Sequence, residues 1–171
     1  MESYEINEDT LALIPKDDDI TTVYEVDGRR IILNNTYKIM EESCEYYGST
    51  FEGRKMGTKN ITGLTHKVPI IVEESNGLVF FPTKSSNDKD CAWISLNHID
   101  YYEKNKGYCF IYFKDGSKVK LKTSYTVINN QVLRASNLLL KLIQRQNSKK
   151  TQKKLKNNVI LWYNGNRYGS I

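Results

Sequence analysis

A β-hairpin between Gly107 and Lys122 is the sequence feature that most constrains the fold. Apolar and aromatic residues lead into Asp115-Gly116, a pair typical of a tight turn, and an alternating strand returns. A two-residue turn there predicts one apolar face, formed by Tyr112, Phe110, Val119 and Leu121. It places three lysines on the other face, opposite apolar partners: Lys118, Lys120 and Lys122 opposite Phe113, Ile111 and Cys109. Such a face either binds a polyanion or is an ordinary solvent-exposed strand face.

Other segments predict an antiparallel sheet with two helices. Runs of β-branched and aromatic residues predict strands at Tyr4–Ile14, Thr21–Val26, Arg29–Leu33, Pro69–Val72, Gly77–Pro82 and Cys91–Ser95. Apolar residues at helical spacing predict a short helix near 36–47 and a long amphipathic C-terminal helix over 126–146. We therefore expect an α+β fold with a mainly antiparallel β core. One domain would cover 1–146, and a basic segment with an apolar tail would cover 147–171.

The long helix predicts three surfaces. The face that we expect to pack on the core contains Ile128, Val132, Ala135, Leu139, Leu142 and Ile143. A basic ridge contains Arg134, Lys141 and Arg145. Leu133 and Leu140 lie outside both surfaces and are candidates for self-association. The apolar end of the tail, 159–163, is expected to dock on the core or on a partner.

Charge is distributed very unevenly along the chain. Residues 1–45 carry a net charge of −8 and residues 46–171 carry +13, which together give the formal net charge of +5. Asp115 is the last acidic residue, and 12 lysines or arginines follow it. A field of one sign attracts polyanions and speeds their association, and it also favours solubility.

Cysteine use and hydropathy predict a cytoplasmic protein. Cys44, Cys91 and Cys109 are widely spaced and form no Cys-x-x-Cys pair, so we expect reduced, buried thiols. No apolar run approaches the roughly 20 residues that a membrane span requires. The acidic N-terminus lacks the basic and apolar regions of a signal peptide.

The sequence contains little that suggests catalysis. Gly48-x4-Gly53 resembles the start of a phosphate-binding loop, but Arg54-Lys55-Met56 follows where Gly-Lys-Ser/Thr is required. His66 and His98 have no partner at metal-ligand spacing. Adjacent acids in turns are weak candidates for a magnesium-dependent nuclease. We therefore expect no enzyme activity, no metal and no cofactor.

The glycine-punctuated stretch Gly48–Thr58 is interpreted as a loop that presents Arg54 and Lys55, with Lys59 extending the same basic segment. A narrow basic finger can approach a nucleic-acid backbone closely, and arginine can enter the narrow minor groove of an A/T tract. A tight structural loop whose basic side chains merely point outward is the alternative.

This stretch also carries a family resemblance. Ser43-Cys44, Tyr46-Tyr47-Gly48-Ser49, Phe51 and Gly53-Arg54-Lys55-Met56-Gly57-Thr58 resemble the signature of the ComK family, the competence transcription factors of Gram-positive bacteria. The likeness continues through His66-Lys67-Val68-Pro69, Phe81-Pro82-Thr83, Cys91-Ala92-Trp93-Ile94-Ser95, Ser124-Tyr125 and Asn130-Gln131-Val132-x-Arg134. It covers about residues 2–145, and the tail 147–171 departs from it.

The resemblance implies a DNA-binding transcriptional activator of the genes for DNA uptake. Such proteins bind paired A/T-rich boxes in double-stranded promoter DNA, largely through the minor groove, as homo-oligomers (dimers or pairs of dimers). A nucleoid-associated location and delivery by a MecA-type adaptor to a Clp protease are implied as well. Physical reasoning selects the candidate DNA contacts: Arg54, Lys55, Lys59, Lys118, Lys120, Lys122, Arg134, Lys141 and Arg145.

A second class of function is consistent with the same charge pattern, namely a basic module that binds RNA or single strands without promoter specificity. Tyr108, Phe110 and Tyr112 would stack on unpaired bases if their face of the hairpin were exposed. Preference for single strands over duplex would favour this class.

Overall fold

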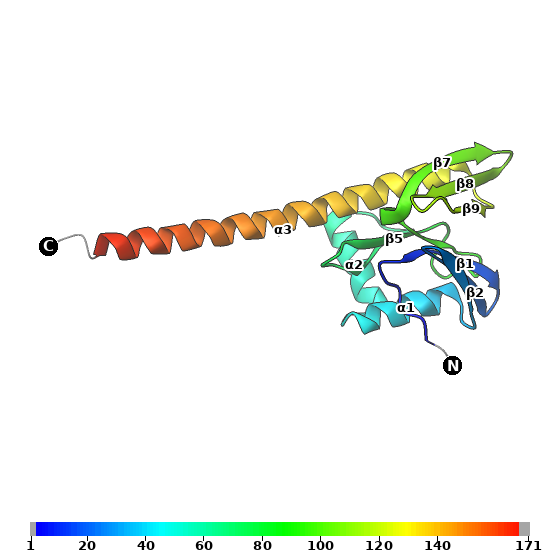
Figure 1. The fold of residues 1–171 in the computed structure, drawn as a ribbon, viewed down its shortest axis with the longest axis horizontal. Helices are drawn as coiled ribbons and strands as arrows, with labels where there is room; N and C mark the ends of the chain where they lie inside the picture. Colours follow the sequence, from blue (N-terminus) through cyan, green and yellow to red (C-terminus); the bar gives the residue numbers. More distant parts are fainter. Residues whose placement is uncertain (1–2, 168–171) are drawn as a thin grey trace. The chain divides into compact units, whose positions relative to one another are not determined.

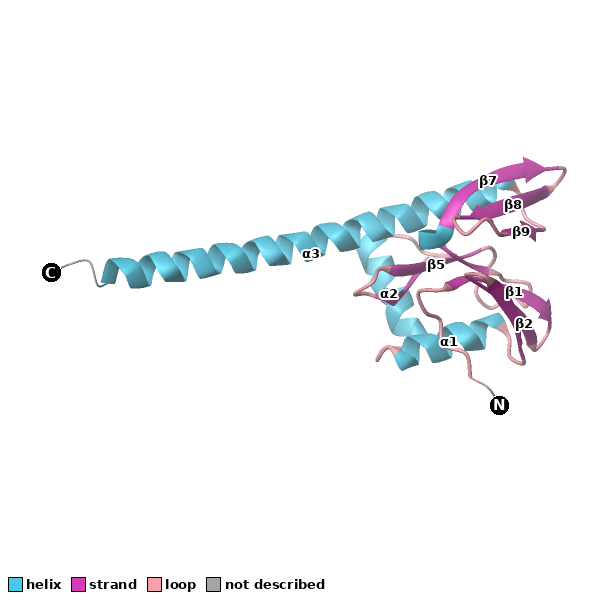
Figure 2. Ribbon diagram, viewed as in Figure 1, coloured by secondary structure: helices cyan, strands magenta, loops and turns pink. Residues whose placement is uncertain are grey.

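The computed structural model describes residues 3–167, with side chains described as far as Ile160. Its strands are β1 (Thr10–Asp17), β2 (Ile20–Glu25), β3 (Gly28–Ile32), β4 (Ile70–Glu73), β5 (Leu78–Pro82), β6 (Trp93–Ser95), β7 (Ile99–Asn105), β8 (Tyr108–Phe113) and β9 (Lys118–Leu121). Its helices are α1 (Thr36–Tyr46), α2 (Phe51–Thr62), a 3₁₀ turn η1 (Leu96–His98) and α3 (Tyr125–Arg167) (Figures 1 and 2). The chain divides into two compact units, Met1–Leu138 and Leu139–Ile171.

The described strands form two antiparallel sheets, which confirms the α+β prediction. The larger sheet has the order β3-β2-β1-β6-β5-β4, so β1 pairs both with its sequence neighbour and with the distant β6. Its first strand begins later than predicted: Tyr4 and Ile6 are buried but precede β1. The Tyr4 hydroxyl instead bonds to Thr10 and Glu25, which fixes this segment across the sheet.

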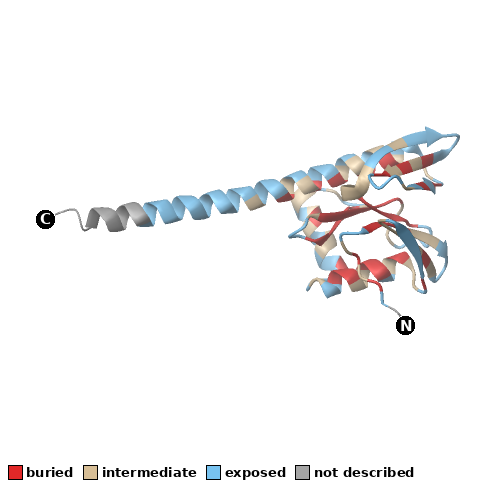
Figure 3. Ribbon diagram, viewed as in Figure 1, coloured by how far each residue is buried: buried red, intermediate tan, exposed pale blue. Residues whose placement is uncertain are grey.

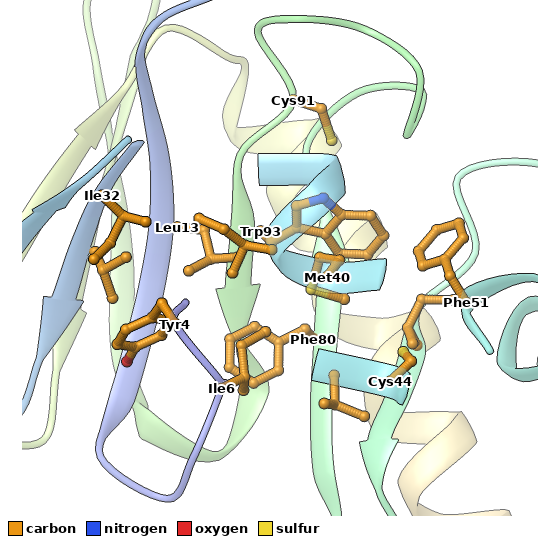
Figure 4. Close-up of a cluster of buried hydrophobic side chains, with 14 of the residues drawn as sticks. Tyr4, Ile6, Leu13, Ile32, Met40, Cys44, Phe51, Phe80, Cys91 and Trp93 are labelled. Carbon is orange, nitrogen blue, oxygen red and sulfur yellow. The ribbon is translucent and has the colours of Figure 1, made fainter. Parts of the chain in front are cut away.

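The main core lies between the six-stranded sheet and the pair α1 and α2. Figure 1 shows both helices on one side of this sheet, and Figure 4 shows the side chains that meet there. Trp93 of β6 is fully buried and packs edge-on against Phe51 at the start of α2, which also contacts Tyr37 of α1. Val79 and Phe81 alternate with Phe80 on β5 and are also fully buried. Both faces of β5 are therefore covered.

Helix α1 forms where the spacing predicted it. The Asn35 side chain caps it by accepting a hydrogen bond from Lys38 N at 2.9 Å. Ile39, Met40 and Cys44 point into the core from one side of the helix.

Helix α2 corrects the interpretation of Gly48–Thr58 as a loop. Thr50 is the N-cap, since its hydroxyl accepts a hydrogen bond from Gly53 N at 3.0 Å, and Gly63 ends the helix with a φ of +74°. The buried Phe51 ring and the Thr58 hydroxyl, which donates to Pro69 O at 2.8 Å, hold the helix on the sheet. These contacts outweigh the poor helix propensity of the glycines.

The smaller sheet has the order β7-β8-β9, and its register differs from the prediction by one residue. The hairpin closes through Phe113 N to Ser117 O and Gly116 N to Phe113 O, both at 2.9 Å, around a three-residue loop. Gly116 has a φ of +89°, as the bulge of such a loop requires. Tyr112 therefore pairs with Lys118 and Phe110 with Lys120. The buried face is instead Cys109, Ile111, Phe113, Val119 and Leu121.

Helix α3 continues well beyond the predicted end at residue 146. Ile128, Ala135 and Leu142 are buried as predicted, and so are Gln131 and Leu138. Val132 and Leu139 are half-buried. Ile143 was expected on the buried face but is 44% exposed. Val159 and Ile160 are exposed, and the side chains of 161–163 lie outside the described residues.

Candidate nucleic-acid interface

Two clefts of the first unit are lined by three of the nine basic residues that the sequence singled out. The first, of about 120 Å³, is lined by Lys55 of α2, by His66 and Lys67 of the following loop, and by Ser85 and Ser86. Trp93 forms part of its wall, and its buried indole N–H has no hydrogen-bond partner in the described protein. None of the residues that line this cleft is acidic.

The second cleft, of about 250 Å³, lies between β1, β9 and the segment that follows β5. Lys84, Lys120 and Lys122 line it together with Thr83 and other small or apolar residues. Asp90 is the one acid among its lining residues, and it pairs with Lys84 at 3.5 Å across solvent-exposed side chains. Such an exposed pair is weak and leaves Lys84 free to exchange partners.

The two clefts flank the end of β5. Pro82 lines the first cleft and Thr83, the next residue, lines the second. The buried Gln131 of α3 donates hydrogen bonds from Nε2 to Pro82 O at 2.6 Å and to Lys67 O at 3.0 Å. This side chain thereby fixes the loop that carries Lys67 against the end of β5.

Arg134 belongs to the same region. Its Nη1 donates to His66 O at 3.3 Å, which places the half-buried guanidinium beside the first cleft. We call the cations of the two clefts, together with this arginine, the basic track: Lys55, Lys67, Lys84, Lys120, Lys122 and Arg134.

Four of these six residues were predicted, and two were not. Lys67 and Lys84 are single lysines in loops, and nothing in their local sequence distinguishes them from ordinary surface lysines. Only the pairing of β5 with β6 and the packing of α3 bring them beside Lys55 and Lys120. Lys67 belongs to the stretch His66-Lys67-Val68-Pro69 that resembles the family, and Lys84 directly follows the stretch Phe81-Pro82-Thr83, which was the available signal.

The remaining predicted contacts lie elsewhere. Arg54 lies on α2 with a buried Nε that has no hydrogen-bond partner in the described protein. Burial raises the pKa of the Cys44 thiol on α1 to about 11, and the guanidinium of Arg54 opposes this shift. Arg54 is therefore directed toward α1, while the half-buried Lys59 lies one turn further along α2.

Lys118 lies on the outer face of the smaller sheet, where its ammonium is 5.6 Å from the centre of the Phe110 ring. Lys141 and Arg145 belong to the second unit, Leu139–Ile171; Lys141 is half-buried and Arg145 is exposed. The structure thus does not bring all nine predicted contacts together.

Other kinds of site find no support in the described part of the chain. Among these residues, no group of three or more His, Cys, Asp or Glu side chains is arranged to hold a metal ion. No helix within the described range is both long and apolar enough to cross a membrane.

Comparisons with known proteins show which family the chain resembles. The chain is 34% identical over 149 residues to the competence transcription factor of Bacillus subtilis strain 168, an alignment that covers 85% of this chain and 78% of that protein. No solved structure matches it. The model of the ComK protein family matches residues 1–147, which include both clefts and every strand described above. The chain therefore belongs to the ComK protein family.

Proposed function

We propose that this protein is a regulator of competence genes that binds A/T-rich duplex DNA through the basic track. The observation that carries the proposal is the collection of six cations in and beside two clefts that flank the end of β5, with Asp90 as the one acid among the residues that line them. Lysines and arginines release counterions from phosphates, and this electrostatic term supplies most of the affinity of such interfaces.

Preference for A/T tracts would come from the shape of the duplex. An A/T tract has a narrow minor groove with enhanced negative potential, which attracts basic side chains. Arg134 is the arginine of the track, and Arg54 is a second candidate for this role on the face of α2 next to α1.

Paired A/T boxes would require more than one copy of the chain. Leu133 and Leu140 are 60% and 53% exposed about two turns apart on α3, and we assign self-association to them. We also propose that the protein acts in the cytoplasm, associated with the nucleoid, and that a MecA-type adaptor delivers it to a Clp protease.

The first test is a fluorescence-anisotropy titration of the full chain with two duplexes of equal length at two salt concentrations. One duplex carries two A/T tracts a helical turn or two apart, and the other is rich in G/C. We expect at least tenfold tighter binding to the A/T duplex, or about 1.4 kcal/mol, retained at the higher salt. Equal affinities that collapse together with salt would refute sequence preference.

Charge-removal variants test the track itself. Lys67→Gln and Lys84→Gln should each weaken binding to both duplexes and lower the slope of log K against log salt by about 0.9. Lys38→Gln is the matched control, since this α1 lysine lies outside both clefts and pairs with Glu41. Equal effects of all three substitutions would remove the track from the interface. Arg54→Ala and Arg134→Ala should in addition reduce the ratio of A/T to G/C affinity.

A further inference from the structure

The outer face of the smaller sheet carries four aromatic rings: Tyr101 of β7 and Tyr108, Phe110 and Tyr112 of β8. We call this surface the aromatic platform. The observed register places these rings on the side opposite the buried Cys109, Ile111 and Phe113. Figure 3 shows β7 largely in the colour of exposed residues.

The inner face of this sheet is already occupied. Tyr102 donates a hydrogen bond to Asn129 Oδ1 at 2.7 Å, and its ring lies against that of Tyr125 at the start of α3. The outer face has no such cover, since Tyr101 and Tyr108 are 47% and 36% exposed. Core packing therefore does not explain why four aromatic residues lie on this side.

Two rings of the platform stack on each other. Tyr101 and Tyr112 stack with their centroids 4.4 Å apart and their planes 8° from parallel. Each ring therefore covers one face of the other, and the outward face of the exposed Tyr101 is the one on which a further flat ring could stack.

Lysines surround these rings. The ammonium of Lys120 lies 4.1 Å from the centroid of Tyr108, and that of Lys118 lies 5.6 Å from Phe110 and 5.9 Å from Tyr112. Cation–π contacts hold both ammonium groups over the sheet. Glu103 is the acid on this face, opposite Phe110.

We infer that the aromatic platform binds unpaired nucleotides, with bases stacked on its rings and phosphates paired with Lys118 and Lys120. Every base has a flat π-face, so stacking tolerates any sequence, while the lysines supply the charge complementary to the backbone. A second copy of this chain is a poorer occupant, because two such faces would bring four ammonium groups together. Duplex DNA is poorer as well, since its bases are stacked on one another.

The platform adjoins the basic track. Lys120 lines the second cleft and also covers Tyr108, because β9 is the outer strand of the sheet. One strand of a locally opened duplex would therefore reach the platform from the track. The inference goes beyond the proposed function, since unpaired bases can be bound whether or not the duplex is recognised.

The test compares three labelled probes by fluorescence anisotropy: an oligothymidylate of about 12 nucleotides, an abasic strand of the same length, and the A/T duplex. The double variant Tyr101→Ser/Tyr112→Ser removes the stacked pair and leaves the track intact. Phe110→Leu keeps the apolar bulk but lacks the flat ring. Tyr46→Ser is the control, because Tyr46 is 67% exposed on α1 and lies outside the smaller sheet. Circular dichroism checks that each variant is folded.

The wild-type protein should bind the oligothymidylate at least tenfold more tightly than the abasic strand. The double variant should lose that ratio, and Phe110→Leu should reduce it severalfold. The control should preserve it, and all variants should bind the A/T duplex within about twofold of wild type.

Wild-type affinities that are equal for the oligothymidylate and the abasic strand would overturn the inference. So would an unchanged ratio in a folded double variant, or a double variant whose only defect is loss of self-association. If the proposed duplex function fails instead, the wild-type protein would bind the A/T and G/C duplexes equally while still binding the oligothymidylate more tightly than the abasic strand.

Discussion

Gln131→Met tests whether one buried amide holds the basic track together. The side chain is 2% exposed and donates to Pro82 O and Lys67 O, so methionine would fill the same volume but leave both carbonyls without this donor. Two lost bonds cost about 1 kcal/mol each, and the desolvated carbonyls add about 1 kcal/mol more, giving about 3 kcal/mol. For a chain of this size that corresponds to a fall in Tm of about 6–12 °C.

The assay is urea unfolding followed by tryptophan fluorescence in a Trp162→Phe background, where the fully buried Trp93 supplies the signal. Asn130→Met is the matched control on the exposed side of the same turn, and it should change the free energy of unfolding by less than about 0.5 kcal/mol. A loss below about 1 kcal/mol for Gln131→Met, with an unchanged m value, would refute the reasoning.

Three further predictions concern stability. Gly57→Ala should raise the free energy of unfolding by about 0.5–1 kcal/mol, since nothing lies within 4 Å of the added Cβ. Gly53→Ala should give no gain, because its Cβ would lie 2.9 Å from the capping Thr50 Oγ1, so urea titrations should show stabilisation for Gly57→Ala alone. Gly116→Ala should cost about 1–2 kcal/mol at a φ of +89°, and an equally stable variant would show that the three-residue loop is absent. Burial raises the pKa of the Cys44 and Cys91 thiols from 9.0 to about 11. Their contribution to the free energy of unfolding is therefore complete below pH 9 and falls by about 2–3 kcal/mol per thiol as the pH rises toward 11. The free energy of unfolding, measured between pH 8 and 11, should depend less on pH in Cys44→Ala/Cys91→Ala.

Sequence periodicity predicted the elements that bury a regular face. Helix α1, strand β2 and the start of α3 follow such patterns, because burial of alternate or helically spaced side chains is what stabilises them. Strands β4, β5 and β6 are short apolar runs that are buried throughout. Strand β7 was not predicted, since most of its residues are exposed and its sequence has no apolar alternation.

The errors have local physical causes. Asp115-Gly116 is compatible with both a two-residue and a three-residue loop, and only the latter leaves Gly116 in the bulge, so the sequence could not decide which face of β8 is buried. Helix α2 was missed because Gly53 and Gly57 disfavour a helix, while the contacts that stabilise it involve the distant Trp93 and Pro69. For the same reason Lys67 and Lys84 could be placed beside Lys55 only from the tertiary structure.

The position of β9 at the rim of its sheet has a consequence for how the protein behaves at high concentration. A free strand edge is a template for pairing with a strand of another molecule, and such pairing leads to aggregation. Lys118 and Lys120 alternate along this strand, and Lys122 follows directly, so mutual repulsion opposes edge-to-edge assembly. Neutralising all three would remove that protection together with the positive charge, and loss of solubility should therefore be checked before any loss of binding is assigned to the interface.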